Sequence, residues 1–292
     1  MTAKVLSAYD LGEQVRELYV NGLPAGDRTG WPSVDKHYSV AEGQLTVITG
    51  WPGSGKSEWL DALLVNLMHQ GWHFAIFSPE NQPQEIHVSK IMEKLVGLPF
   101  GAGPSQRMTM EDMLACMEAT NGRFGFIASD TGTPISAQTV IETAEPWLAK
   151  HADAKRGLII DPWNELEHWR PKNLSETEYV SQSLSYVRSW ARKNGVHVWI
   201  VAHPQKMRVD GKLPIPRPDM ISGSQNWWNK ADNAITVWRN LEDVHDQEIE
   251  IHIQKIRFKH IGFPGVVKLR YDRVTGKYHE LPNLRAYRQS DS

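Results

Sequence analysis

The chain has 292 residues, a length that predicts one or two domains and allows a full hydrophobic core. Charged residues make up 23% and the formal net charge is -2, so composition indicates no general affinity for nucleic acid and any such contact must be local. Cys116 is the single cysteine, which excludes a disulfide framework, and no apolar run approaches the length of a membrane span. We therefore expect a soluble, cytoplasmic protein without membrane contact.

Residues 10–20 predict a short amphipathic helix that begins with Asp10 and Glu13 as a capping box. Its apolar face consists of Leu11, Val15, Leu18 and Tyr19. Loop-forming residues follow, so we expect residues 1–24 to form an arm outside the main domain, residues 25–285. The arm either folds back on its own domain or docks on a neighbouring copy of the chain.

A phosphate-binding loop follows the first predicted strand. The apolar run 45–49 leads into Gly50-Trp-Pro-Gly-Ser-Gly-Lys-Ser57, and a helical pattern begins at once. Glycines let the backbone turn several N–H groups toward one point, where the following helix adds its positive end. The predicted ligand is the triphosphate of ATP or another NTP or dNTP, and the binding residues are Gly50, Pro52, Gly53, Ser54, Gly55, Lys56 and Ser57. Lys56 is expected at the β- and γ-phosphates, and Ser57 at Mg²⁺.

Three further polar residues follow predicted strands. Glu80 comes after the strand 73–78 and is the candidate general base, with an exposed turn residue as the alternative. Asp161 ends the apolar run 158–160 and is predicted to hold Mg²⁺ through water. His203 ends the strand 197–203, where it either senses the γ-phosphate or serves a structural role.

The remaining pattern predicts an α/β fold. Helices are expected at 86–100, 109–120 and 137–150, a strand at 124–128, and a helix that starts at the Ser175–Glu178 capping box. Strands at 233–239, 247–256, 265–271 and 277–281 suit an antiparallel extension of a mostly parallel twisted sheet flanked by helices. Residues 286–292 read as a polar tail.

The long segment 205–226 is the candidate contact for single-stranded DNA, with a mobile surface loop as the alternative. Its basic and small residues, with the basic residue just beyond it, suit a nucleic-acid backbone: Lys206, Arg208, Lys212, Arg217, Gly223, Ser224 and Lys230. Further on, Lys255 and Arg257 are expected at the tip of a hairpin. They either solubilise an edge strand or reach a phosphate bound by a neighbouring copy.

The order and spacing of these features resemble the RecA-like P-loop NTPase motor of replicative hexameric helicases, closest to the Twinkle and phage primase-helicase branch of the DnaB superfamily. The features are the phosphate loop 50–57, Glu80, Asp161, His203, the Gly-Ser loop near 223, and Lys255-x-Arg257. By this resemblance Glu80 is the catalytic carboxylate, Asp161 the Walker B residue, His203 the γ-phosphate sensor, Lys255 and Arg257 a pair inserted into the next subunit's site, and Arg239 and Tyr271 a sandwich for the base. The helix 10–20 resembles the linker helix that docks on the adjacent subunit.

The resemblance implies a ring-forming, Mg²⁺-dependent ATPase, most simply a hexamer, that moves along single-stranded DNA and unwinds duplex. No primase-like segment precedes the phosphate loop. We therefore expect either a motor module of a larger protein or a stand-alone motor with primase and polymerase on separate chains. The expected setting is a bacterium or phage-infected cell, with an organelle matrix as the alternative. Trp227 and Trp228 depart from the small or polar residues expected beside the DNA loop. Two alternatives remain: a RecA- or RadA-type filament for strand exchange, and a KaiC-like signalling ATPase that binds no DNA.

Overall fold

The computed structural model describes residues 4–129, 134–168, 170, 173–205, 213–222, 225–243 and 245–282. The described helices are α1 Gly12–Asn21, α2 Pro32–Asp35, α3 Lys56–Met68, α4 Gln84–Val96, α5 Met110–Thr120, α6 Ala137–Ala149, α7 Glu176–Asn194 and α8 Gln225–Lys230. The strands are β1 Leu45–Thr49, β2 Trp72–Phe77, β3 Phe124–Phe126, β4 Lys155–Ile160, β5 Val196–Val201, β6 Asn233–Trp238, β7 Glu248–Ile256, β8 Gly265–Tyr271 and β9 Tyr278–Glu280. Short 3₁₀ turns occur at Trp163–Glu165 and Pro218–Met220.

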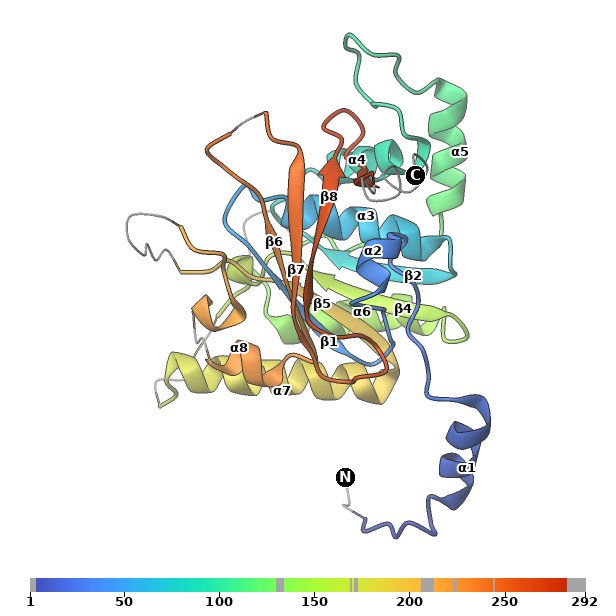
Figure 1. The fold of residues 1–292 in the computed structure, drawn as a ribbon, viewed down its shortest axis with the longest axis vertical. Coiled ribbons are helices and arrows are strands. Elements are labelled where there is room, and N and C mark those ends of the chain that lie inside the picture. Colours follow the sequence, from blue (N-terminus) through green and yellow to red (C-terminus); the bar gives the residue numbers. More distant parts are fainter. Residues whose placement is uncertain are drawn as a thin grey trace, which may run out of the picture.

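The described strands form one sheet in the order β3-β2-β4-β5-β1-β6-β7-β8-β9 (Figure 1). The first six strands in this order, from β3 through β2, β4, β5 and β1 to β6, pair in parallel. Strands β7, β8 and β9 add antiparallel pairs at one edge. The parallel strands are continuous apolar runs because both faces of this part of the sheet are covered. In β7, buried residues alternate with partly exposed ones, as in a strand with one covered face. The predicted fold, with its antiparallel C-terminal extension, is confirmed.

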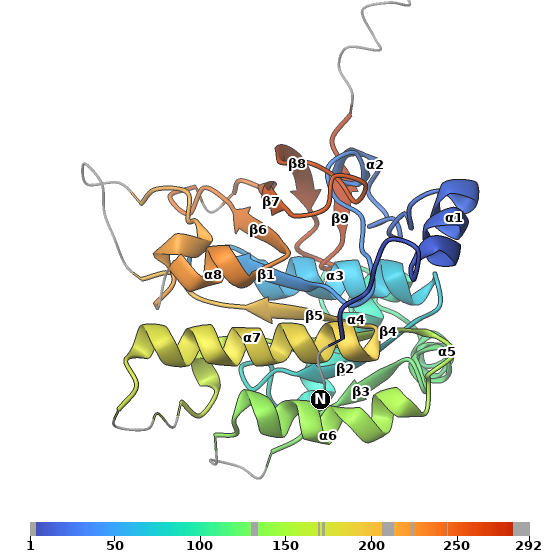
Figure 2. The same ribbon diagram turned by 90° about the horizontal axis from the view of Figure 1, so that it is seen from below.

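Helices cover the two faces of the parallel sheet, as Figure 2 shows for α3 on one side and for α6 and α7 on the other. Successive residues of β1 separate between the two cores: Ile48 packs with the α3 side, and Val47 with the α6 and α7 side. Each helix presents an apolar stripe, and in α7 it consists of Val180, Leu184, Val187, Trp190 and Ala191. Ser175 caps α7 and forms the predicted capping box with Glu178.

Three local predictions were wrong. Helix α1 has no capping box, because Asp10 instead accepts hydrogen bonds from the backbone N–H and hydroxyl of Ser7. Residues 225 and 226, predicted as the end of the long loop 205–226, instead begin helix α8, because the indole of Trp227 is fully buried and holds this segment against the helices that cover the sheet. Lys255 lies within β7, paired with β6, so it is not at the tip of a hairpin.

Helix α1 stands apart from the sheet and its covering helices (Figure 1) and has no buried residue. Its predicted apolar face is exposed to solvent, with Val15 at 58% and Tyr19 at 89%. The proposed polar tail 286–292 lies outside the described residues. In the part of the chain that the structure describes, no helix has the length and hydropathy needed to cross a membrane.

Candidate nucleotide site

The carboxyl ends of the parallel strands place the predicted site residues at one edge of the sheet. The phosphate loop follows β1, Glu80 follows β2, Asp161 follows β4, His203 follows β5 and Arg239 follows β6. In open α/β sheets this edge is where ligands bind. The topology therefore brings together residues from Gly50 to Arg239, which are 189 positions apart in the sequence.

The phosphate loop requires glycine where its backbone is crowded. A Cβ at Gly50 would lie 2.3 Å from the carbonyl oxygen of Val237 and 2.5 Å from Oγ of Ser54. Gly55 has φ of 93° and directly precedes α3, so it turns the chain in the left-handed conformation into the helix. The backbone N–H groups at the start of α3 have no partner within the helix and are available to an anion.

Lys56 and Asp161 are both buried beneath the loop. Burial lowers the pKa of Lys56, while the charges of Asp161 and Glu80 raise it. Burial raises the pKa of Asp161 to about 6 and outweighs the hydrogen bond from Ser57, which lowers it. Oδ1 of Asp161 is buried and has no hydrogen-bond partner among the described residues. A buried carboxylate oxygen without a partner beside a serine hydroxyl fits a Mg²⁺ site, because Mg²⁺ prefers oxygen ligands and retains several waters.

Glu80 and His203 face each other across the site. Nε2 of His203 lies 3.4 Å from Oε1 of Glu80, and the backbone N–H of His203 donates to Oδ1 of Asn164 at 2.9 Å. Burial and the charge of Lys56 lower the pKa of His203, although Glu80 raises it. We therefore expect a neutral imidazole at neutral pH, able to donate one hydrogen bond and accept another. The side chain of Glu80 is 48% exposed, which leaves it open to water and substrate.

A cavity of about 560 Å³ joins these groups. It is lined by Pro52, Gly53, Ser54, Gly55, Lys56, Ser57, Glu58, Glu80, Asn81, Lys90, His203, Arg239, Ile249, Tyr271 and Tyr278. Arg239 and Tyr271, the predicted base sandwich, therefore line the same cavity as the phosphate loop. Tyr278 closes it from β9, since its ring lies 5.0 Å from that of Tyr271 and its hydroxyl donates to the Gly55 carbonyl at 3.2 Å.

Sequence reasoning missed three charged and amide residues that line the cavity at the phosphate loop: Glu58, Asn81 and Lys90. Nζ of Lys90 donates to Oδ1 of Asn81 at 3.0 Å and lies 3.2 Å from a carboxylate oxygen of Glu58. Asn81 directly follows Glu80 and was a detectable signal, since the same strand end carries both. Lys90 gives no local signal, because only the packing of α4 against α3 brings it to the cavity.

Lys255 and Arg257 lie away from this cavity, at the opposite edge of the sheet. The backbone N–H of Arg257 donates to the carbonyl of Asp232, and the backbone N–H of Asp232 donates to the carbonyl of Leu45 at the start of β1. The phosphate loop leaves the other end of β1, and five strand residues span roughly 16 Å. An arginine side chain cannot cover that distance within its own chain.

The predicted DNA-contact residues are only partly described. Lys206, Arg208, Lys212, Gly223 and Ser224 lie outside the described residues. Arg217 is exposed, with Nε 3.2 Å from Oδ1 of Asp219, and its Cζ lies 5.3 Å from the centre of the Trp228 ring. Lys230 is the last residue of α8, and its carbonyl oxygen accepts a hydrogen bond from Arg188 of α7.

The sheet order, the phosphate loop and the polar residues at the carboxyl edge define a RecA-like P-loop NTPase. Two solved structures have the same fold: an ATPase domain (TM-score 0.78, 16% identity, covering 96% of this chain and 100% of that chain) and a DnaB-like replicative helicase described with its interactions with primase (TM-score 0.75, 17% identity, covering 93% and 68%). The sequence is 39% identical over 288 residues to the chloroplastic/mitochondrial Twinkle homolog protein of Arabidopsis thaliana. The predicted resemblance to the Twinkle branch of the DnaB superfamily is confirmed.

That alignment covers 95% of this chain but 40% of the Arabidopsis protein, so the chain spans less than half the length of this relative. No family model matches the sequence.

Proposed function

We propose that this chain is the motor of a replicative-type DNA helicase, which hydrolyses ATP to move along single-stranded DNA and separate duplex. The observation that carries the proposal is the cavity that joins the phosphate loop, Glu80, His203, Arg239 and Tyr271. The similarity of the chain to a Twinkle homolog favours a helicase motor over a strand-exchange filament or a signalling ATPase. The same site suits other NTPs or dNTPs, because its predicted contacts are to the phosphates and to the face of a base, which all these nucleotides have.

The proposed mechanism uses a general base, groups that stabilise negative charge and a γ-phosphate sensor, and we assign a residue to each. Glu80 orients the attacking water and accepts its proton, and Lys56 stabilises negative charge on the β- and γ-phosphates. Ser57 and Asp161 would hold Mg²⁺, which neutralises the phosphate oxygens when bound. His203 lies within hydrogen-bonding reach of Glu80 and would contact the γ-phosphate directly. Arg239 and Tyr271 position the base.

The position of Lys255 and Arg257 supports a site shared between subunits. These residues lie at the sheet edge opposite their own phosphate loop, so they can reach a nucleotide only on another copy of the chain. In a closed ring each chain contributes the phosphate loop to one interface and the basic pair to the next. Turnover would then require assembly, and most simply a hexamer.

Coupling to DNA would run through the chain that follows His203. The segment leading to the predicted DNA contacts begins at Gln205, two residues beyond the sensor. Loss of the γ-phosphate removes a partner of His203 and shifts the start of this segment. Arg217 and Lys230 are proposed contacts to strand phosphates, together with Lys206, Arg208, Lys212, Gly223 and Ser224.

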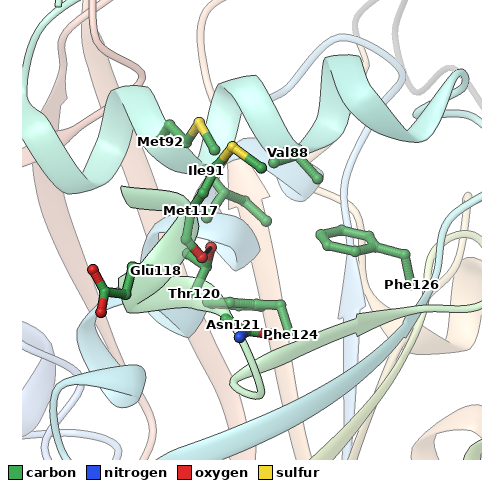
Figure 3. A pocket seen from close by; sticks show the side chains of 9 residues that line it. All are labelled: Val88, Ile91, Met92, Met117, Glu118, Thr120, Asn121, Phe124 and Phe126. Carbon is green, nitrogen blue, oxygen red and sulfur yellow. Dashed lines mark hydrogen bonds between the residues drawn. The ribbon is translucent and has the colours of Figure 1, made fainter. Parts of the chain in front are cut away.

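An apolar groove supports docking of the arm on a neighbouring copy. Side chains of α4, α5 and the edge strand β3 line a cavity of about 450 Å³ (Figure 3): Val88, Ile91, Met92, Met117, Glu118, Thr120, Asn121, Phe124 and Phe126. Helix α1 presents an exposed apolar face of matching character and has no buried residue in its own chain. We propose that α1 of one copy binds this groove of the next and helps to close the ring.

The chain is expected to work with a primase and a polymerase. The DnaB-like helicase of similar fold is described with its interactions with primase, which supports the primase as a partner. The chloroplastic/mitochondrial relative supports an organelle matrix as an alternative to the bacterial or phage-infected cytoplasm.

The test is ATP hydrolysis at about 100 mM salt, with and without a single-stranded oligonucleotide, across a range of protein concentrations. Moderate salt matters because exposed phosphate contacts are screened at higher ionic strength. We expect specific activity to rise with both DNA and protein concentration, and the assembled protein to unwind a forked duplex. Activity that depends on protein concentration but ignores DNA would refute the helicase and favour the signalling ATPase.

A further inference from the structure

Helix α8 connects the predicted DNA-contact segment to the predicted trans-acting cations. Trp227 anchors it: the indole is fully buried, packs edge-on against Trp163 at 5.2 Å, and its Nε1 donates to the carbonyl of Ser222 at 2.6 Å. These contacts attach the helix to Ser222, at the end of the 213–222 stretch. Its other tryptophan, Trp228, is not needed for this anchor.

Two cations share the ring of Trp228. Cζ of Arg217 lies 5.3 Å from the ring centroid and Nζ of Lys255 lies 5.7 Å from it. Nζ of Lys255 also donates a hydrogen bond to the backbone carbonyl of Trp228. Both cations are attracted to the electron-rich ring but repel each other. A change in the charge of one cation therefore alters how strongly the ring attracts the other. Burial first, and then the charge of Arg257, lower the pKa of Lys255 to about 8.

Arg257 is bound to the end of the same helix. Its Nη2 donates to the carbonyls of Asn229 at 2.9 Å and Ala231 at 3.1 Å, and its Nε lies 2.8 Å from Oδ1 of Asp232. Asp232 is fully buried and also accepts from the backbone N–H of Leu45 at the start of β1. The geometry of α8 therefore sets where Lys255 and Arg257 lie relative to the sheet.

We propose that Trp228 is a positioning residue that transmits strand contact at Arg217 to Lys255 and Arg257. A strand phosphate adds a second anion beside Arg217, whose Nε already lies 3.2 Å from Oδ1 of Asp219. The guanidinium then competes less with Lys255 for the ring of Trp228. The pair is then held in one geometry for the neighbouring nucleotide site. This inference rests on the proposed function and adds the route by which DNA stimulates hydrolysis.

The test measures maximal stimulation of ATP hydrolysis by a saturating oligonucleotide, and separately the affinity for that oligonucleotide. Trp228→Leu, which removes the ring, is expected to reduce the stimulation about fivefold, the size of a lost cation–π contact, with unchanged strand affinity. Trp228→Phe keeps an aromatic face and should retain at least about half of the stimulation. Adding Arg217→Gln to Trp228→Leu should cause no further loss, because both changes break one route.

The outcomes separate this inference from the proposed function. If the unmodified protein is not stimulated by DNA, the helicase assignment fails. If it is stimulated and Trp228→Leu is stimulated equally, the positioning role is refuted. A fall in strand affinity without loss of stimulation at saturation would make Trp228 a direct strand contact and also refute the inference. Trp228→Met, whose flexible side chain fills irregular space, replaces the leucine variant if that variant unfolds.

Discussion

Glu80 is the residue whose chemistry decides whether the cavity is catalytic. It is half-exposed at the end of β2 and lies 3.4 Å from His203. Glu80→Gln preserves the shape of the side chain but removes the proposed base, so turnover should fall by about 10²- to 10⁴-fold while ATP stays bound. Retained nucleotide after filtration and the hydrolysis rate together check this. Glu85→Gln, an exposed glutamate on the next helix, is the control and should keep normal turnover.

Asp161 predicts a pH-dependent stability in the absence of metal. Burial raises its pKa from 3.8 to about 6, so the folded chain retains a proton that the unfolded chain releases between these values. The contribution of protonated Asp161 to the free energy of unfolding is therefore lost as pH rises toward 6. Above pH 6 the folded chain holds the ionised carboxylate of Asp161 in its interior. Asp161→Asn should raise the free energy of unfolding at pH 8, by at most about 3 kcal/mol, and have little effect near pH 4.

Urea unfolding without Mg²⁺ or nucleotide measures this difference, with the exposed Asp153→Asn as control. A destabilised Asp161→Asn at pH 8 would contradict the conclusion that burial raises the pKa of this carboxyl group. The affinity for Mg²⁺ should rise with pH, opposite to the stability of the metal-free chain, because the metal needs the ionised form of Asp161. Below pH 6 this affinity should fall about tenfold for each pH unit.

Elements were predictable from sequence where their signals are local. The apolar run 45–49 and the glycines after it specify a strand, a loop and a helix start within 14 residues of one another, and all three were placed correctly. Helix α8 was missed because its six residues carry no helical period, and only the burial of Trp227 by distant Trp163 fixes it. The partners of Lys255 and Arg257 were missed for the same reason, since they are backbone carbonyls of α8.

Helix α1 has an apolar face with no partner in its own chain, and this predicts assembly through the arm. Val15→Asp places a charge at a 58% exposed position of that face and should weaken assembly about 10- to 100-fold, the range set by burial of one valine. Sedimentation across protein concentration measures this. Met117→Asp in the groove of Figure 3 should have a similar effect.

Arg16→Gln is the matched control, because it changes the charge of α1 by the same amount but lies off the apolar face. Normal assembly of Val15→Asp, with or without an altered Met117→Asp, would exclude docking through this face of α1. Weakened assembly by Arg16→Gln to the same degree would indicate a general charge effect and not a specific apolar contact.

In the whole molecule, the sheet holds the phosphate loop and Arg257 one strand length apart. The phosphate loop lies at the carboxyl edge of β1, and Arg257 connects through Asp232 to its amino edge. If Arg257 acts at a nucleotide, it must therefore act at the site of a neighbouring chain, as we propose. Arg257→Ala alone should therefore abolish turnover with near-normal nucleotide binding, and hydrolysis that persists within about threefold would refute the trans-acting role.

A mixing experiment tests the shared site directly. Lys56→Ala and Arg257→Ala chains are each expected to be inactive, but in a random mixture about one quarter of interfaces pair an intact phosphate loop with an intact Arg257. We expect up to roughly a quarter of normal hydrolysis to return if sites act independently. Lys56→Ala mixed with Glu80→Gln is the control, because both changes fall on the same side of the interface and no interface becomes whole. An inactive Lys56→Ala and Arg257→Ala mixture that still assembles would mean that Arg257 does not act on the neighbouring site.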